Sequence, residues 1–203
     1  VRTAILSGAG GTLSISLVDK TEPRGVDGIV ALALGLVGDT PAEAKAAEAF
    51  VYEHPVVALF QTWVEVSDGV NYAHRLFLEP REGFAPTSVL QTEGTADTYA
   101  PPRTIESIAG AAGIPIVAPQ VSAIDALTLR GIANVESVVE GNVGDGAATA
   151  GLLQFEGGDH LSVTAGFNPS RFDRSTGLEG TTREAVVGNL LAFGRYRLDS
   201  NVS

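Results

Sequence analysis

Three short runs along this 203-residue chain, at residues 3–6, 88–93 and 151–156, have the hydrophobic pattern of buried strands. Each run borders glycine-rich or polar turn residues, which is typical of strands covered on both faces of a parallel sheet. The first run stops at the glycine-rich segment 7–11 and predicts an interior strand, which needs a neighbour on each side. We therefore expect a sheet larger than the strands that this chain supplies.

The stretch between the first two runs has a mostly helical pattern. Residues 26–36 predict a short apolar helix. Thr40 then supplies an N-cap, Pro41 a proline at the first helical position and Glu43 an acid in the first turn of a second helix. Residues 20–85 are therefore predicted to form a helical insertion between two strands.

A third helical segment follows Pro55, and it is more apolar than one core-facing stripe requires. Surplus apolar surface on an insertion between two sheet strands is typical of a cap over a pocket. A set of ordinary packing helices explains the same pattern equally well. Both interpretations stay open at this point.

The second half of the chain alternates helices with strands. Residues 102–112 predict a helix, residues 116–119 an extended stretch, and residues 124–139 an apolar segment of either type. A capping-box pattern headed by Thr181 predicts a C-terminal helix over residues 181–198.

This element order predicts an α/β fold, with a mostly parallel sheet, flanking helices and a helical cap insertion. The predicted core comprises residues 1–19 and 86–203, and the predicted cap comprises residues 20–85.

The charge and composition of the chain limit the classes of partner and site that it can have. A net charge of −11 opposes binding to nucleic acid, which depends on clustered lysine and arginine. The chain has no cysteine, so disulfides, a thiolate nucleophile and cysteine-type zinc sites are excluded. No apolar stretch reaches the roughly 20 residues that a membrane span requires. Acidity without cysteine is compatible with an exported protein, although the compartment stays open.

Two candidate catalytic residues follow successive predicted strands. Asp97 comes after the run 88–93 and precedes two prolines, and His160 comes after the run 151–156. Carboxyl ends of parallel strands meet at one edge of a sheet, so an acid and a histidine placed there can pair. Histidine, with an ordinary pKa of about 6.5, suits the general base of acyl transfer. A simpler role for Asp97 is to cap the following turn or helix.

Other sites are less well supported by the sequence. His160, Asp159 and Asp145 lack the spacing of a metal site, so no metal or cofactor is expected. The segment 7–12 has neither the third glycine of a dinucleotide site nor the Gly-Lys pair of a phosphate-binding loop. A Gly-x-Ser-x-Gly turn, which would hold a nucleophilic serine, is also missing.

The segment Gly94-Thr95-Ala96-Asp97-Thr98-Tyr99-Ala100-Pro101-Pro102, followed later by Gly157-Gly158-Asp159-His160, resembles the C-terminal half of the α/β-hydrolase family. Within that family it resembles particularly the bacterial esterases and lipases with a large cap inserted after the sixth strand. The resemblance implies that Asp97 is the acid and His160 the base of a Ser-His-Asp triad. It also implies that the serine and the oxyanion-hole donors lie on an absent N-terminal portion or chain.

The expected function is therefore part of a carboxylic-ester hydrolase that is inactive alone. An uncharged ester or lipid would be its substrate, with Phe60, Trp63 and Tyr72 as candidate lining residues of an apolar pocket. A peptidase or a polyester hydrolase is not separated from an esterase by these patterns. A chain that begins at Val1 and contains no Met fits a fragment, a cleaved chain or one half of a two-piece protein. The alternative function is a non-catalytic binding or assembly module that keeps the hydrolase architecture.

Overall fold

A computed structural model describes residues 3–36, 38–47, 50–136 and 138–157, together with the backbone of four later strands. The helical elements are α1 (Leu13–Asp19), α2 (Val26–Ala33), α3 (Pro41–Ala47), α4 (Pro55–Val64), η1 (Glu65–Ser67), η2 (Gly69–Leu76), α5 (Pro102–Ala112) and α6 (Asp125–Leu129). The strands are β1 (Thr3–Ser7), β2 (Ser88–Gly94), β3 (Val138–Val139), β4 (Ala150–Phe155), β5 (Leu161–Thr164), β6 (Phe172–Thr176), β7 (Thr181–Val187) and β8 (Arg195–Leu198).

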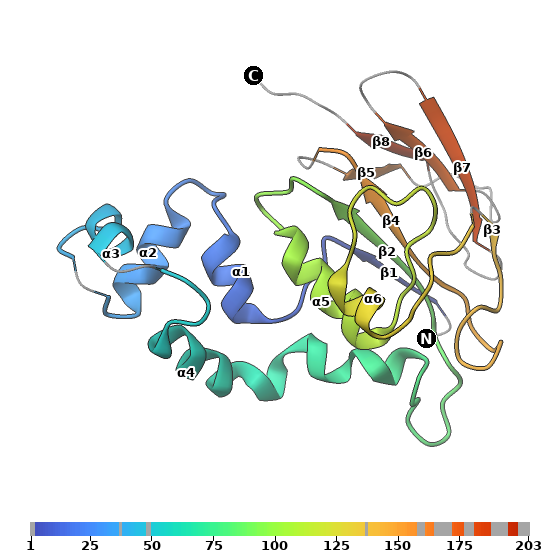
Figure 1. The fold of residues 1–203 in the computed structure, drawn as a ribbon, viewed down its shortest axis with the longest axis horizontal. Helices are drawn as coiled ribbons and strands as arrows, with labels where there is room; N and C mark the ends of the chain where they lie inside the picture. Colours follow the sequence, from blue (N-terminus) through green and yellow to red (C-terminus); the bar gives the residue numbers. More distant parts are fainter. Residues whose placement is uncertain are drawn as a thin grey trace.

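A parallel three-stranded sheet in the order β1-β2-β4 forms the centre of the fold. Isolated parallel bridges extend it, since Ile116 pairs with Leu152 of β4 and Val117 pairs with Val135. The helices α1 to α4 lie to one side of this sheet in Figure 1, whereas α5 packs directly beside β2. The α/β class predicted from the sequence is therefore confirmed, as are the three predicted strands and the extended stretch near residue 116.

The first strand lies at an edge of the described sheet and not in its interior. β1 pairs with β2 alone among the described residues, and the side chain of Ile5 is 41% exposed. The buried position belongs to β2, whose residues are covered from Ser88 to Glu93. The prediction of an interior first strand is thus not met within the described residues.

Local start and stop signals determine the helices. In α3, Thr40 and Glu43 exchange capping hydrogen bonds, as the sequence predicts. Helix α4 begins at Pro55 and helix α5 at Pro102. Proline has no backbone N–H, but an N–H at the first helical position makes no hydrogen bond within the helix, so nothing is lost there. Helix α5 ends at Ala112, and the following Gly113 adopts the left-handed conformation that favours glycine.

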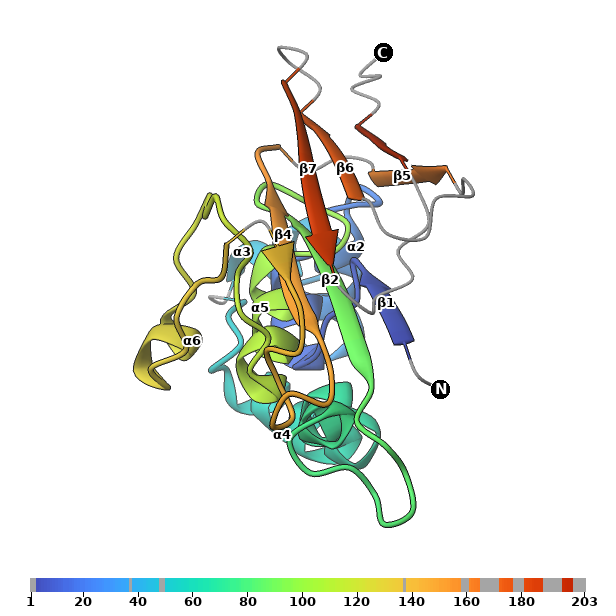
Figure 2. The same cartoon turned by 90° about the vertical axis from the view of Figure 1, so that its right-hand side faces the viewer.

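The predicted C-terminal helix over residues 181–198 is wrong. The structure places β7 and β8 in this range, within a second sheet of order β3-β7-β6-β8-β5. Figure 2 shows β6 and β7 side by side, and they pair as antiparallel strands. Thr181, Thr182, Val186 and Val187 are β-branched, and such residues favour a strand once a partner strand is present.

Two of the apolar clusters in the described part of the chain share no buried residue with each other. The larger cluster joins the central sheet to α5 and η2, and it includes Phe77, Ile105 and Leu152. The smaller cluster lies among α2, α3 and α4, and it includes Leu36 and Val57. The helices of the predicted insertion therefore bury apolar side chains against one another as well as against the sheet.

Candidate functional site

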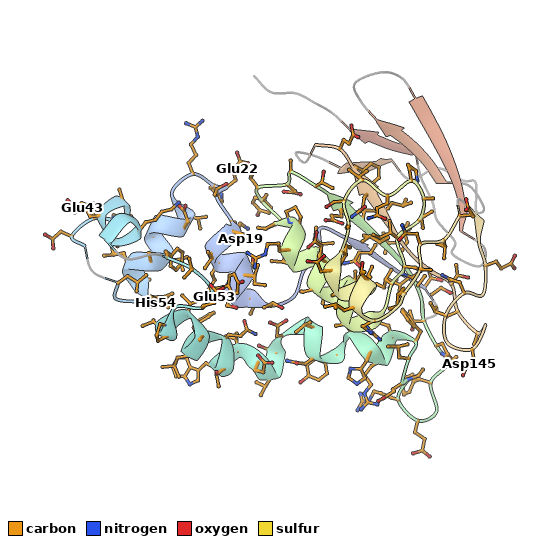
Figure 3. All side chains as sticks on the ribbon, in the orientation of Figure 1. Asp19, Glu22, Glu43, Glu53, His54 and Asp145 are labelled. Atoms are coloured by element: carbon orange, nitrogen blue, oxygen red, sulfur yellow. The ribbon has the colours of Figure 1, made fainter. Side chains whose placement is uncertain are left out.

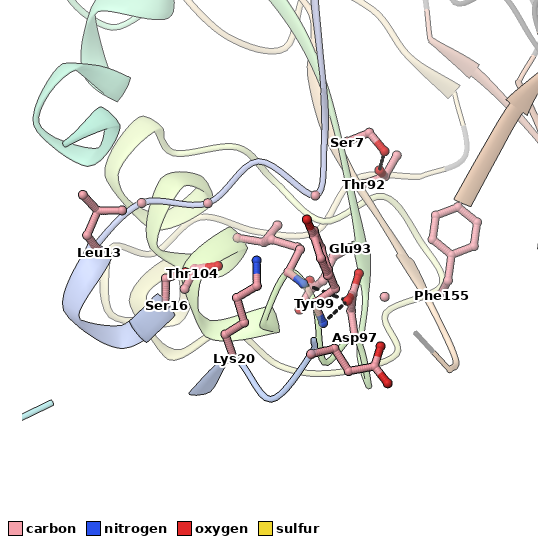
Figure 4. Close-up of a pocket in the computed structure, with 17 residues that line it drawn as sticks. Ser7, Leu13, Ser16, Lys20, Thr92, Glu93, Asp97, Tyr99, Thr104 and Phe155 are labelled. Atoms are coloured by element: carbon pink, nitrogen blue, oxygen red, sulfur yellow. Dashed lines mark hydrogen bonds between the residues drawn. The ribbon is translucent and has the colours of Figure 1, made fainter. Parts of the chain in front are cut away.

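A cavity of about 550 Å³ opens at the carboxyl ends of the three parallel strands. Ser7 ends β1, Gly94 ends β2 and Phe155 ends β4, and all three line the cavity (Figure 4). The remaining lining residues are Gly8, Gly10, Gly11, Leu13, Ser16, Lys20, Glu22, Thr92, Glu93, Asp97, Tyr99, Ala100, Thr104 and Ile105. Ligands of open α/β sheets bind at this edge, and the cavity has the size of a small-molecule site.

The glycine-rich turn after β1 lets the chain pass close to α5. The amide of Gly11 donates to the carbonyl of Thr104 at 2.9 Å. A Cβ atom added at Gly10 would lie 2.6 Å from Cβ of Thr104 and 3.0 Å from its backbone carbon. The turn therefore needs glycine at position 10 because the neighbouring helix leaves no space for a side chain.

Gly10→Ala is expected to lower the free energy of unfolding by about 1–3 kcal/mol, since α5 or the turn must move to relieve the overlap. Urea unfolding monitored by circular dichroism measures this change. Gly69→Ala is the matched control, because a Cβ atom there would lie 3.6 Å from Ile108, an ordinary contact distance. Equal stability of the two variants would contradict the proposed close packing.

Asp97 lines the cavity directly after β2, and its side chain is half-buried. Its Oδ1 accepts hydrogen bonds of 2.8 Å from the amides of Tyr99 and Ala100. Asp97 therefore caps the following turn, which is the simpler of its two predicted roles. Its Oδ2 accepts no hydrogen bond from the described part of the chain, so this oxygen is free to orient another group.

The loop that carries Asp97 runs alongside the start of the loop after β4. The amide of Thr95 donates to the carbonyl of Phe155 at 3.0 Å, and the amide of Ala96 donates to the carbonyl of Gly157 at 3.4 Å. His160 follows three positions after Gly157 but lies outside the described residues. The structure therefore joins the two loops up to position 157, directly beside Asp97.

The three candidate substrate-binding residues lie away from this cavity. Phe60 and Trp63 belong to α4 and Tyr72 to η2, and none of them lines it. The side chain of Trp63 is 85% exposed, and the Tyr72 hydroxyl donates to the carbonyl of Val66 at 2.6 Å. Apolar side chains that do line the cavity include Leu13, Ile105 and Phe155.

The two described histidines have other partners. Figure 3 shows His54 at the start of α4, where its Nδ1 accepts a hydrogen bond of 3.2 Å from the amide of Val56. Nε2 of His74 lies 3.9 Å from a carboxylate oxygen of Glu79. Neither histidine lines the cavity, so neither competes with His160 for a role beside Asp97.

Glu93 also lines the cavity, although its place in the run 88–93 predicts only a strand residue. It is 1% exposed, and its Oε2 accepts a hydrogen bond of 3.0 Å from Nε2 of Gln154. Burial, together with repulsion from Glu106, raises the pKa of Glu93 to about 7, although the Gln154 hydrogen bond opposes this rise. The available signal was an acid inside a buried run, because buried ionisable groups cluster at functional sites.

Metal and membrane sites find no support in the described residues. No group of three or more histidine, cysteine, aspartate or glutamate side chains gathers there as metal ligands would. Among the described helices, none combines the length and hydrophobicity that a bilayer crossing requires.

Comparisons with protein-family models, with curated proteins and with solved structures found no match to this chain.

Proposed function

We propose that this chain supplies the acid and the histidine of a Ser-His-Asp triad in a carboxylic-ester hydrolase. The observation that carries the proposal is the pairing of the Thr95 and Ala96 amides with the carbonyls of Phe155 and Gly157. This pairing brings the loop of Asp97 against the loop that leads to His160, at the edge of the sheet where ligands bind.

The hydrogen bonds of Asp97 suit the role of an orienting acid. Such an acid must itself be fixed and must keep one oxygen for the imidazole. Oδ1 of Asp97 is fixed by the amides of Tyr99 and Ala100, and Oδ2 has no partner in the described part of the chain. In the proposed triad, Oδ2 accepts from Nδ1–H of His160, and Nε2 of His160 takes the proton of the serine hydroxyl.

The proposed partner is an N-terminal portion or chain that carries the serine and the oxyanion-hole donors. The proposed substrate is a small ester with an uncharged acyl group. Leu13, Ile105 and Phe155 offer apolar contact in the cavity, whereas an anionic acyl group would meet the Asp97 carboxylate. The helices α2 to α4, within residues 20–85, are proposed as a cap, a role that their own apolar cluster supports.

His160→Ala in the complete protein, serine portion included, is expected to lower kcat for a short-chain nitrophenyl ester by about a thousandfold or more. Asp97→Asn is expected to lower kcat by a similar order, because the histidine then adopts the wrong tautomer. His74→Ala is the matched control and should leave kcat unchanged. In the unsubstituted protein, turnover should fall on the acid side as the imidazole becomes protonated.

The alternative is a binding or assembly module without catalysis, which the turn-capping role of Asp97 favours. Such a module would still bind its partner after the substitution His160→Ala. Ester turnover by the 203-residue chain alone, with labelling by a serine-directed inhibitor, would contradict both proposals.

A further inference from the structure

The residue after Asp97 is joined to the start of the predicted insertion. The amides of Thr21 and Glu22 both donate to the carbonyl of Thr98, at 3.2 and 3.3 Å. Thr98 lies directly between Asp97 and Tyr99 in the chain. These backbone hydrogen bonds therefore connect the segment that leads into the predicted cap to the turn that presents Asp97.

A side-chain contact lies beside these hydrogen bonds. Nζ of Lys20 lies 3.7 Å from the centre of the Tyr99 ring, and Figure 4 shows both residues close to Asp97 at the cavity. The face of an aromatic ring attracts a lysine ammonium at this distance, which at an exposed site favours the contact about two- to fivefold. In the described part of the chain, Lys20 forms no ion pair with a carboxylate, so the ring is the partner of its charge.

The backbone of Lys20 is held at the end of α1. Its amide donates to the carbonyl of Ser16 at 3.1 Å and so closes the last turn of this helix. Asp19, the last residue of α1, is in turn tied to α5, because Nη1 of Arg103 lies 3.2 Å from its Oδ2. The Lys20 ammonium therefore reaches the Tyr99 ring from an anchored position.

The orientation of the Asp97 carboxylate depends on the place of this turn. Oδ1 of Asp97 accepts from the amides of Tyr99 and Ala100 at 2.8 Å, so the carboxylate moves with the backbone of both residues. Ala100 also packs closely against the turn after β1, since a Cβ atom added at Gly8 would lie 3.3 Å from Cβ of Ala100. The turn of Asp97 is thus held by the turn after β1 and by the segment that follows α1.

We propose that Lys20 is a positioning residue whose ammonium, held over the Tyr99 ring, keeps residues 20–22 bound to the turn of Asp97. Lys20 and Glu22 also line the cavity, so the same segment forms part of the cavity wall. Release of the segment opens this wall and frees the turn together, which couples the position of the cap to that of the acid. As a statement about catalysis, the inference rests on the proposed function, because Asp97 is the proposed orienting acid.

Amide hydrogen exchange of Thr21 and Glu22, followed by NMR on the 203-residue chain, tests the proposal. Lys20→Met keeps an apolar stem and removes the charge, so protection of both amides should fall about two- to fivefold. Tyr99→Leu removes the ring and should cause the same fall, which keeps the test valid if one variant does not fold. The double variant should lose no more protection than either single variant, because each substitution removes the same contact.

Conservative variants separate this contact from a general loss of packing or charge. Lys20→Arg keeps a cation and Tyr99→Phe keeps the ring face, so both should keep the protection of the unsubstituted chain. Arg24→Met removes a positive charge from a nearby exposed side chain and is the matched control, which should also keep it. Unchanged protection in Lys20→Met and Tyr99→Leu, or an equal fall in Arg24→Met, would overturn the inference.

Activity of the complete protein, serine portion included, tests the link to Asp97. At a temperature where exchange shows the segment about half open in Lys20→Met, kcat of this variant should be roughly a third lower than that of the unsubstituted protein, and Lys20→Arg should keep kcat. An active protein that loses protection in Lys20→Met without this change in kcat would overturn the positioning role. Failure of the proposed function looks different, because exchange needs no substrate: the expected loss of protection in a protein without ester turnover supports the contact and contradicts the triad.

Discussion

Asp68→Ala is expected to lower the free energy of unfolding by about 3 kcal/mol, because one buried carboxylate accepts hydrogen bonds from three helical elements, α1, α4 and η2. Oδ1 of Asp68 accepts from the amides of Thr12 and Val70 at 3.0 and 3.1 Å. Oδ2 accepts from the amide of Leu13 at 3.0 Å and from Nε2 of Gln61 at 2.9 Å. Alanine would leave the amides of Thr12, Leu13 and Val70 without this acceptor at a position where the residue is 2% exposed, whereas Nε2 of Gln61 would keep its hydrogen bond to Glu65.

The effect extends to the cavity because Asp68 fixes the first turn of α1. Thr12 gives α1 no side-chain cap, so the cap comes from Asp68, which is 56 positions away from Thr12 in the sequence. Leu13 and Ser16 of α1 line the cavity, so a loosened α1 changes its wall. Urea unfolding measures the loss of stability, and Asp39→Ala, at an exposed aspartate, should change stability by less than about 0.5 kcal/mol.

The same carboxylate predicts a dependence on acid. Burial alone would raise the pKa of Asp68, but the hydrogen bonds from Gln61 and from the amides of Leu13, Val70 and Thr12 outweigh it and lower the pKa below 3.8. An acid with a lowered pKa stabilises the fold above its unfolded value and loses this effect as the pH falls through its folded value. The stability difference between the unsubstituted protein and Asp68→Ala should therefore shrink below about pH 4. A difference that stays constant down to about pH 2 would assign the loss to packing alone.

Most of the helices and strands that the sequence predicts correctly are determined by local signals. The prolines at 55 and 102 and the Thr40–Glu43 cap act within one helical turn, so the sequence alone reveals those helix starts. Strand β2 is recognisable because it is a short run between turn residues. Pairing between strands is different, since neighbours come from distant positions, and neither the edge position of β1 nor the partners of β7 can be read from a local pattern.

The same division between local and long-range signals applies to the candidate site. Asp97 stands out because Gly94 ends a strand and two prolines follow, and the structure places it at the cavity. Glu93 was missed because an acid in a strand is usually assigned to the solvent face. Its burial depends on α5 and β4, whose residues Glu106 and Gln154 are distant in sequence. Phe60, Trp63 and Tyr72 belong to the predicted cap, but the path of α4 and η2, which determines what these side chains contact, is not a local property.

Leu152→Ala should cause the largest loss of stability among the substitutions considered, about 3–5 kcal/mol. Leu152 is fully buried and belongs to the larger apolar cluster. Its backbone pairs with Gln91 of β2 on one side and with Ile116 on the other. Truncation leaves a cavity that these strands cannot fill, because their register is fixed by ladder hydrogen bonds on both sides of β4.

Leu129→Ala is the matched control, since the same atoms are removed from a side chain that is 87% exposed on α6, and its effect should stay within about 0.5 kcal/mol. Thermal and urea unfolding of both variants measure the difference.

Because the smaller cluster of α2, α3 and α4 shares none of its buried residues with the larger one, Val57→Ala should destabilise those helices while the β2–β4 amides keep their protection from exchange. Simultaneous loss of protection in both regions would show that the helices and the sheet unfold as one unit, and the proposed cap would then not be a separate folding unit.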